Sequence, residues 1–164
     1  MTSPTSPTSP SSGSSPPSPA EGSDDAADSA RDIAIRRVLR HGHNIDITTT
    51  GRRTGEPRRI EITFHSFDGR LYISGMPSPR TRAWLQNLRA DPRFTFHLKA
   101  LLKADLPATA REITDEAERR EVLAKVARVW NRDPEPMVRF SPLIEVTIDG
   151  YAPAPVGQGS SASA

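Results

Sequence analysis

The sequence contains no cysteine among its 164 residues. That absence excludes disulfide bridges, thiolate nucleophiles and cysteine metal sites. The sequence also lacks a run of about 18 apolar residues, the length that a helix needs to cross a bilayer. The N-terminus has no basic segment followed by an apolar one, the pattern of a secretory signal. A cytoplasmic protein without a membrane-spanning segment is therefore the expectation.

Motifs for nucleophilic and hydrolytic chemistry are missing as well. No Gly-x-Ser-x-Gly elbow occurs, and no pair of carboxylates can be placed together as glycoside hydrolysis requires. His41 and His43 lack the spacing of metal ligands, and His65 and His97 are expected on the polar faces of strands, so no metal site is predicted. Cofactor chemistry remains, in which the cofactor performs the difficult step and the protein holds it.

Positive charge is concentrated in one part of the chain. The whole sequence carries a formal charge of only +2, but Arg31 to Arg111 holds 16 Lys or Arg and 7 Asp or Glu, a difference of +9. Such an excess predicts an anionic partner. Nucleic acid, an anionic membrane surface and a phosphorylated cofactor all fit this count.

Composition divides the chain into one domain and two tails. Residues 1–28 are dominated by Ser, Thr and Pro and end in an acidic patch, and residues 152–164 are rich in Ala, Pro, Ser and Gly. Such segments have almost nothing to bury, so both tails are predicted to be disordered. Residues 29–151 form the predicted domain. Its first helix is expected to be capped by Ser29 and to run to about Arg40.

The domain is expected to be mainly β with helices, an α+β fold. Alternation of apolar and polar residues, as in Ile60, Ile62 and Phe64, is the signal for strands. About six strands and two or three helices fit a small barrel and do not fit a parallel α/β sheet. The expected strands are Ile45–Thr50, Arg58–Phe67, Arg70–Ser74, Arg93–Lys99, Lys103–Ile113 and Leu143–Ile148.

Two further helices are expected between the strands. Thr81 is the predicted cap of one, which ends near Asp91, and Thr114 is the predicted cap of the other, which ends near Trp130. The buried stripe of the second helix is expected to consist of Val122, Val126 and Val129.

The turn between the first two strands stands out by its arginines. Gly55 permits a positive φ and Pro57 fixes φ, so the chain must turn tightly there. Guanidinium groups fork onto phosphate or carboxylate oxygens, and turn amides can join them in an anion cradle. A solvated hairpin with scattered charges is the alternative. The arginines are Arg52, Arg53, Arg58 and Arg59.

Three segments together carry a resemblance to a known family. They are Thr49 to Arg58, Ser74 after a later strand, and Trp84 to Pro92, a Trp-x-x-Asn-Leu helix that ends at a proline. In this order they resemble the deazaflavin-dependent nitroreductase and quinone reductase family. The resemblance implies a split β-barrel related to FMN-binding oxidases. It also implies hydride transfer from reduced coenzyme F420 to a quinone, enone or nitro-type acceptor.

The resemblance also implies which residues form the site. Two arginines, Arg53 and Arg58, would bind the phosphate and nearby carboxylates of F420, and Ser74 would lie at the reacting ring as the catalytic candidate. Trp84 can alternatively be a packing residue between helix and barrel, and Asn87 can alternatively tie a loop. The implied cofactor-binding residues are Arg52, Arg53, Thr54, Arg58, Ser74, Gly75, Trp84 and Asn87.

Some features keep other functions open. The stretch from Ala127 to Phe140 has no tyrosine, where the nitroreductase member of the family lines its substrate pocket with tyrosines, which weighs against nitro compounds. FMN could occupy the same arginine turn, and the barrel could carry its ligand without turnover. A basic nucleic-acid-binding module is a further alternative, although aromatics near the arginines are few. Related split barrels often form homodimers.

Overall fold

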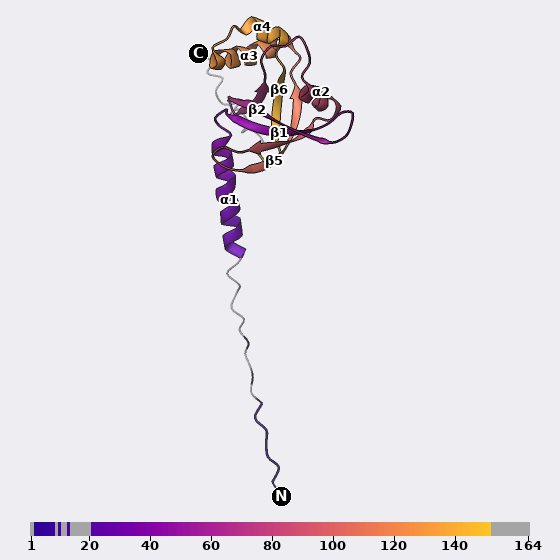
Figure 1. Ribbon diagram of the computed structural model, residues 1–164. Coiled ribbons are helices and arrows are strands. Elements are labelled where there is room, and N and C mark those ends of the chain that lie inside the picture. Colours follow the sequence, from indigo (N-terminus) through magenta and orange to yellow (C-terminus); the bar gives the residue numbers. More distant parts are fainter. Residues whose placement is uncertain (1, 9, 11–12, 14–20, 152–164) are drawn as a thin grey trace, which may run out of the picture.

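The computed structural model describes residues 2–8, 10, 13 and 21–151. Within them the chain forms six strands that close into an antiparallel barrel in the order β1-β2-β3-β6-β5-β4, with four helices around it (Figure 1). The predicted fold class is confirmed, and the helix beyond the expected number is α4. The elements are α1 (Glu21–Val38), β1 (Asn44–Thr50), β2 (Pro57–Phe67), β3 (Arg70–Ser74), α2 (Ala83–Ala90), β4 (Arg93–Leu98), β5 (Ala104–Glu112), α3 (Glu116–Trp130), α4 (Pro134–Phe140) and β6 (Leu143–Ile148).

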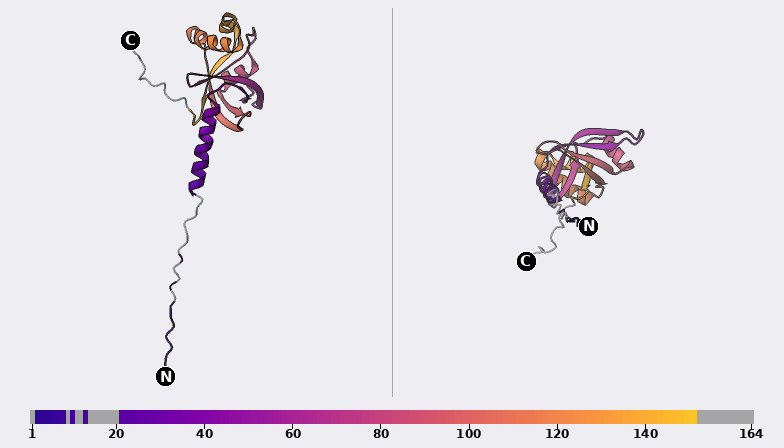
Figure 2. Two further views of the ribbon diagram at one scale, coloured as in Figure 1. Left: turned by 90° about the vertical axis from the view of Figure 1, so that its left-hand side faces the viewer. Right: turned by 90° about the horizontal axis from the view of Figure 1, so that it is seen from below.

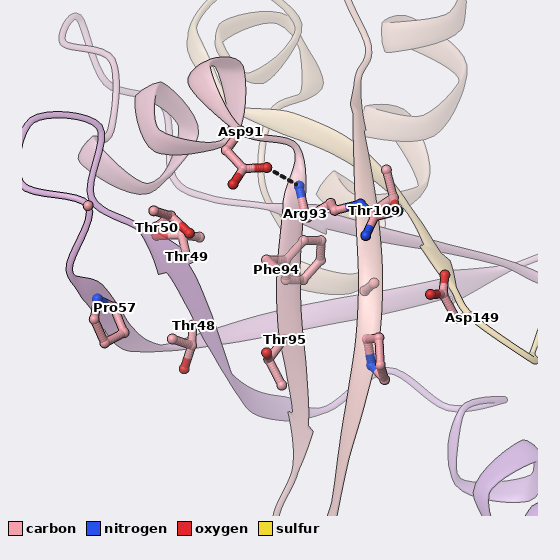
Figure 3. A pocket seen from close by; sticks show the side chains of 13 residues that line it. Thr48, Thr49, Thr50, Pro57, Asp91, Arg93, Phe94, Thr95, Thr109 and Asp149 are labelled. Carbon is pink, nitrogen blue, oxygen red and sulfur yellow. Dashed lines mark hydrogen bonds between the residues drawn. The ribbon is translucent and has the colours of Figure 1, made fainter.

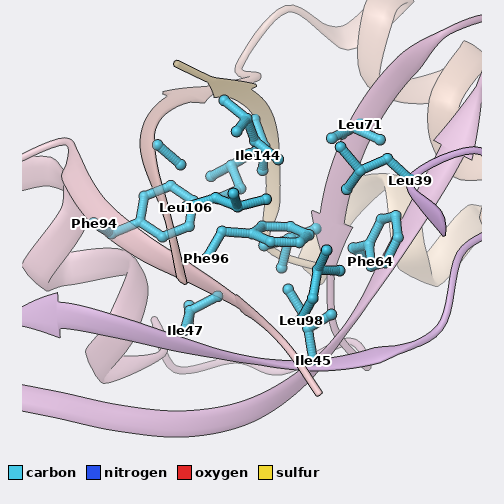
Figure 4. Packing of buried hydrophobic residues seen from close by; sticks show 14 of the residues in the cluster. Leu39, Ile45, Ile47, Phe64, Leu71, Phe94, Phe96, Leu98, Leu106 and Ile144 are labelled. Carbon is cyan, nitrogen blue, oxygen red and sulfur yellow. The ribbon is translucent and has the colours of Figure 1, made fainter. Parts of the chain in front are cut away.

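One apolar face of each strand fills the barrel. Ile45 and Ile47 of β1, Phe64 of β2 and Phe96 of β4 are fully buried and pack together (Figure 4). The rings of Phe64 and Phe96 meet edge to face with their centroids 5.2 Å apart, an arrangement that aromatic quadrupoles favour. Burial of this face is the main source of stability and fixes the register of the ladders, because a slip by one residue would turn every apolar side chain outward.

Strand β2 is much longer than β3, the second of the two strands with which it pairs. Its first half, from Pro57 to Thr63, pairs with β1, whereas only its last four residues pair with β3. On the face of β2 that carries the buried Phe64, Ile60 and Ile62 are therefore only partly covered and Arg58 is exposed. This open stretch of β2 forms one wall of the candidate site.

Two helices close one end of the barrel. In both orientations α3 and α4 lie together against this end (Figures 1 and 2). They bury a second apolar cluster, in which Val126 and Met137 of the helices meet Tyr72 and Leu143 of the strands. The cluster continues along α3 to Trp130, which packs at its edge.

Two predicted helix caps and one predicted core residue were wrong. Asp115, not Thr114, caps α3, and its carboxylate accepts a hydrogen bond of 3.0 Å from the Glu118 amide. The residue before α2 is Arg82 and not Thr81, and it makes no side-chain cap. Val129 is 62% exposed, because the buried stripe of α3 drifts to the next position along the helix and ends at Trp130.

The first helix begins earlier than predicted. It starts at Glu21 instead of Ser29, and it ends at Val38. The alanines of this segment favour a helix, although the composition of the segment alone indicated disorder. Ile35 and Leu39 at its C-terminal end are buried against the barrel, whereas its N-terminal end points away from the barrel (Figure 2).

Two histidines are buried where polar strand faces were expected. His65 is 3% exposed because the outer face of β2 is covered there by α3, and its ring meets the edge of Trp130 with centroids 5.1 Å apart. His97 is 7% exposed and bridges Thr48 and Asp105 on the two neighbouring strands. Both corrections arise from tertiary packing that strand periodicity does not reveal.

Most of the predicted tails lie outside the described residues. This applies to residues 152–164 and, at the N-terminus, to residues 1, 9, 11–12 and 14–20. The predicted domain of residues 29–151 stays a prediction, and helix α1 extends eight residues beyond its predicted N-terminal boundary. Of the helices in the described part of the chain, none combines the length and the apolar character needed to span a membrane.

Candidate functional site

The arginine turn between β1 and β2 is tight at its base. The amide of Gly51 donates to the carbonyl of Glu56 at 2.8 Å, and the amide of Gly55 donates to the carbonyl of Gly51 at 2.7 Å. Gly55 has φ of +71°, which confirms the positive φ predicted for it. A Cβ atom on Gly51 would lie 2.9 Å from the Thr54 hydroxyl oxygen, so this position has room only for glycine unless Thr54 moves.

Helix α2 is attached to this turn by side-chain hydrogen bonds. The Oδ1 atom of Asn87 accepts from the Arg52 amide at 3.1 Å, and its Nδ2 atom donates to the Thr49 hydroxyl at 3.1 Å. The Arg52 guanidinium also donates to the side-chain carbonyl of Gln86. Asn87 is 7% exposed, so both of its hydrogen bonds are shielded from water. The alternative that Asn87 ties a loop is therefore observed, beside its place in the site.

A hollow of about 370 Å³ lies between the turn, the open stretch of β2 and α2. Six of the eight residues that the resemblance assigns to the cofactor line it. Trp84 is half-buried and packs on the barrel core as well as lining the hollow, so the packing role is observed and the cofactor role stays a prediction. The six are Arg52, Arg53, Thr54, Arg58, Trp84 and Asn87, and the sequence analysis missed Thr49, Gly51, Ile60 and Ala83.

The electrostatics of this hollow are those of an anion site. The side chains of Arg52, Arg53 and Arg58 are exposed, and among the described residues the only carboxylate at ion-pair distance from any of them is that of Glu56, 3.9 Å from Arg58. Arg59 takes no part, because it points to the opposite face of β2 and pairs with Asp46 at 2.9 Å. Three of the four arginines of the turn therefore remain available to an anion.

Ser74 and Gly75 line a second hollow, of about 470 Å³. Ile60 belongs to the first hollow and Ile62 to the second, and since they lie two residues apart on one face of β2, the two hollows are neighbours. The Ser74 hydroxyl is 1% exposed and donates to the carbonyl of Pro142 at 2.8 Å.

The second hollow is mainly apolar, with one added charge. The residues that the sequence analysis did not assign to it are Ile62, Thr63, Met76, Trp130 and Arg132. Alternation placed Ile62 on one strand face with Ile60 and Phe64, and it could not be assigned to the site without knowing that β2 extends beyond β3. Trp130 is the last residue of α3, in the stretch that only the resemblance links to a substrate pocket.

A third hollow, of about 350 Å³, faces outward between β1, β4 and β5 and is lined largely by threonines (Figure 3). Next to it the Thr48 hydroxyl lies 2.7 Å from Nε2 of His97, whose Nδ1 lies 2.6 Å from Asp105. A hydroxyl, an imidazole and a carboxylate in a chain resemble the parts of a nucleophilic site. Thr48 lies within the paired β1 strand, so nearby amides serve the ladders and no oxyanion hole is formed.

Comparison with known proteins identifies the family. The model of the family described as F420H(2)-dependent quinone reductase matches residues 26–146. The chain belongs to this family. It is therefore an oxidoreductase with coenzyme F420 as its cofactor, and the predicted family, enzyme class and cofactor are confirmed. Several site residues fall inside the matched range, but the match does not test their individual roles.

Solved structures agree at the level of the fold. A 5-nitroimidazole antibiotic resistance protein of Bacteroides thetaiotaomicron is 17% identical, with a TM-score of 0.51 over 71% of this chain and 79% of the other. A protein of the pyridoxinephosphate oxidase family from Clostridium acetobutylicum is 10% identical, with a TM-score of 0.51 over 73% and 82%. The F420-H2 dependent reductase FDR-A is 22% identical, with a TM-score of 0.49 over 63% and 93%. The barrel thus has the split-barrel fold of the two structures with a TM-score of 0.51.

Proposed function

We propose that this member of the family passes hydride from reduced coenzyme F420 to a quinone, an enone or a related electrophile, in the two neighbouring hollows along β2. The observation that carries the proposal is the convergence of Arg52, Arg53 and Arg58 with Trp84 and Asn87 on one hollow. These residues come from two separate segments of the sequence, and the resemblance to the family assigns both segments to one cofactor. A nitro-type acceptor remains a third candidate, disfavoured by the lack of tyrosine after α3.

The donor set fits the anionic half of the cofactor. Arg53 and Arg58 would bind the phosphodiester and neighbouring carboxylates, because their guanidinium groups are exposed and nearly free of carboxylates. Arg52 is partly engaged with Gln86 and would assist. Thr54 accepts from the Glu56 amide at 3.2 Å, so it shapes the turn that presents the arginines.

The neighbouring apolar hollow fits the reacting end. The reduced deazaflavin supplies hydride when bound. Ile62, Met76 and Trp130 would offer an apolar surface to a flat acceptor, and Ser74 and Gly75 would border the ring. Since the Ser74 hydroxyl already donates its proton to a carbonyl, solvent entering the open hollow is the proposed proton source.

A titration and an acceptor panel test this function. The purified full chain is titrated anaerobically with oxidised F420 and, separately, with FMN, each followed by cofactor fluorescence. Oxidation of reduced F420 is then measured with a naphthoquinone, cyclohexenone and a nitroimidazole. We expect saturable F420 binding and turnover that is fastest with the quinone. Saturation by FMN alone would favour the flavin alternative, and binding without any turnover would favour a carrier.

Homodimerisation and a cytoplasmic location stay predictions from the resemblance and the sequence. Sedimentation velocity over a concentration range checks the first, since a dimer would double the mass at high concentration. No observation at the site favours a nucleic-acid-binding role, since Trp84 is the one aromatic side chain that lines the arginine-rich hollow.

A further inference from the structure

A separate cavity lies on the other side of α2 from the hollow between the arginine turn, β2 and α2, which is called the cofactor hollow from here on. Ala83, Trp84 and Asn87 of this helix line the cofactor hollow. Leu85 and Arg89 line the separate cavity, which has a volume of about 350 Å³. The β3–α2 loop, the end of β5 and the end of α4 complete it. Its volume lies at the lower end of the range of small-molecule sites.

Arginines dominate the lining of this cavity. Only Arg89 is neutralised, through a two-pronged pairing with the carboxylate of Glu112 at 2.8 and 2.6 Å. In the described part of the chain no carboxylate pairs with the other four. The five arginines of the lining are Arg80, Arg82, Arg89, Arg119 and Arg139, and Glu112 is its one carboxylate.

Arg119 is held in place by the protein itself. Its guanidinium donates to the backbone carbonyls of Ile113, Val138 and Ser141 at 2.7–3.0 Å. Burial lowers the pKa of Arg119, which means that the protein environment stabilises its charge less than water does. Carbonyl dipoles offset only part of this cost, so an anion in the cavity would relieve it.

A buried hydroxyl accompanies the arginines. Ser141 lines the cavity and is 3% exposed, and its Oγ atom has no hydrogen-bond partner among the described residues. A buried polar atom without a partner is uncommon in native proteins and costs stability. The Oγ–H group can donate to an oxygen of a bound anion.

We propose that this cavity binds a small polyanion, a molecule with two or more phosphate or carboxylate groups, at a site separate from the F420 hollow. Guanidinium groups bind both kinds of oxygen in the same forked geometry. Four like charges without carboxylate partners repel one another around one cavity, and a multivalent anion removes that repulsion. The site does not depend on the function proposed for the cofactor hollow.

The test is calorimetric titration of the cofactor-free full chain with inorganic pyrophosphate and with citrate, at low salt so that screening is weak. The double variant Arg80→Ala/Arg139→Ala removes two exposed arginines whose side chains make no hydrogen bond or ion pair with the described part of the chain, so it is expected to fold normally. The matched control Arg37→Ala/Arg128→Ala removes two exposed charges from α1 and α3. We expect saturable binding that is at least about 100-fold weaker in the first variant and unchanged in the control.

Two further measurements, on Ser141→Ala and on F420-saturated protein, test the proposal. Ser141→Ala is expected to weaken anion binding about tenfold without lowering the unfolding temperature, because it removes an unpaired buried hydroxyl. Anion binding is also expected to persist in protein saturated with F420. The proposal is overturned by equal losses in both double variants, by binding that Arg53→Ala abolishes, or by complete competition with F420.

Discussion

Arg58 and Arg59 are neighbours in sequence, yet they lie on opposite faces of β2 and have opposite surroundings. Arg58 points into the cofactor hollow, where its nearest carboxylate is 3.9 Å away. Arg59 points to the outer face and donates to Asp46 at 2.9 Å, in a network that also includes Lys99. One face of the strand therefore keeps a positive charge free, and the other neutralises it within the protein.

The same difference continues along the strand. On the face of Arg58, Ile60 and Ile62 lead from the charged turn to the apolar hollow. On the face of Arg59, Glu61 joins the ion network and His65 is buried beneath α3. On the outer face the polar groups are paired or neutral, whereas Arg58 on the other face is exposed and its nearest carboxylate is 3.9 Å away. We therefore propose that exposure without a close partner, more than charge alone, indicates a binding role in this chain.

The largest expected effect is on cofactor binding. Each charge-assisted contact contributes about 1.5–3 kcal/mol, so Arg53→Ala/Arg58→Ala should weaken F420 binding by at least about 100-fold. The maximal rate should change only a few-fold, since these contacts are equal in ground and transition states. Arg59→Ala is the matched control and should leave F420 affinity within about twofold. Fluorescence titration and steady-state rates measure both quantities. Equal losses in both variants would mean that overall charge, and not the cofactor-facing arginines, sets the affinity.

Burial of His65 on the outer face of β2 should make the unfolding free energy depend on pH. Burial lowers the pKa of His65 from 6.5 to about 4. Unfolding exposes the imidazole of His65, which then takes up a proton. The contribution of His65 to the unfolding free energy is therefore fully present above about pH 6.5 and is lost as pH falls toward 4. The loss reaches about 3 kcal/mol at roughly 1.4 kcal/mol per pH unit.

His65→Leu isolates this contribution. Urea unfolding between pH 4 and 7 should show a flatter stability profile for His65→Leu than for the parent, whereas the exposed His41→Gln should keep the parent profile. A His65→Leu profile parallel to that of the parent would mean that His65 is already protonated in the folded state.

The next largest effect is expected when the hydrogen bonds that link α2 to the arginine turn are removed. Asn87→Ala removes two shielded hydrogen bonds and leaves the Arg52 amide and the Thr49 hydroxyl without partners. The unfolding free energy should fall by about 2 kcal/mol, and F420 affinity should fall with it because the arginines lose their support. Gln86→Ala, which removes two exposed hydrogen bonds, one from Arg52 and one to the Thr81 carbonyl, should cost less than about 0.5 kcal/mol. Denaturant unfolding of the two variants compares them, and equal costs would show that Asn87 does not support the turn.

Much of the fold followed from periodicity. All six strands begin and end within one residue of the predicted positions, because alternation and turn residues are local signals; β3 and β6 match at both ends, whereas the starts of β1, β2 and β5 are shifted by one residue. The errors occurred where a local rule competes with tertiary packing or with a neighbouring residue. Asp115 outcompeted Thr114 as a cap, and Ala-rich acidic sequence extended α1 to Glu21.

The site was predictable only where its residues are consecutive or form a motif. The turn and α2 carry most of the predicted cofactor residues, and these do meet in one hollow. Ile60 and Ile62 have the signature of core residues, and only the unequal lengths of β2 and β3 expose them. Trp130 reaches the site from a helix far along the chain, and only the resemblance, which links the stretch Ala127 to Phe140 to a substrate pocket, pointed to its region.

The smallest expected effect concerns Ser74, the predicted catalytic residue, whose role stays a proposal. Its hydroxyl is buried and donates to the Pro142 carbonyl, so Ser74→Ala removes one neutral hydrogen bond and should lower the unfolding free energy by about 1 kcal/mol. Because that proton is already engaged, the maximal rate should stay within about threefold of the parent. General acid catalysis contributes about 10²–10⁴-fold, so a rate loss of about 100-fold at unchanged F420 affinity would instead make Ser74 the proton donor. Ser66→Ala, also a serine-to-alanine change on the β2–β3 pair, serves as the control. The decisive comparison is therefore between the maximal rate and the unfolding free energy of the same variant. Loss of a structural serine lowers the unfolding free energy, whereas loss of a catalytic serine lowers the rate.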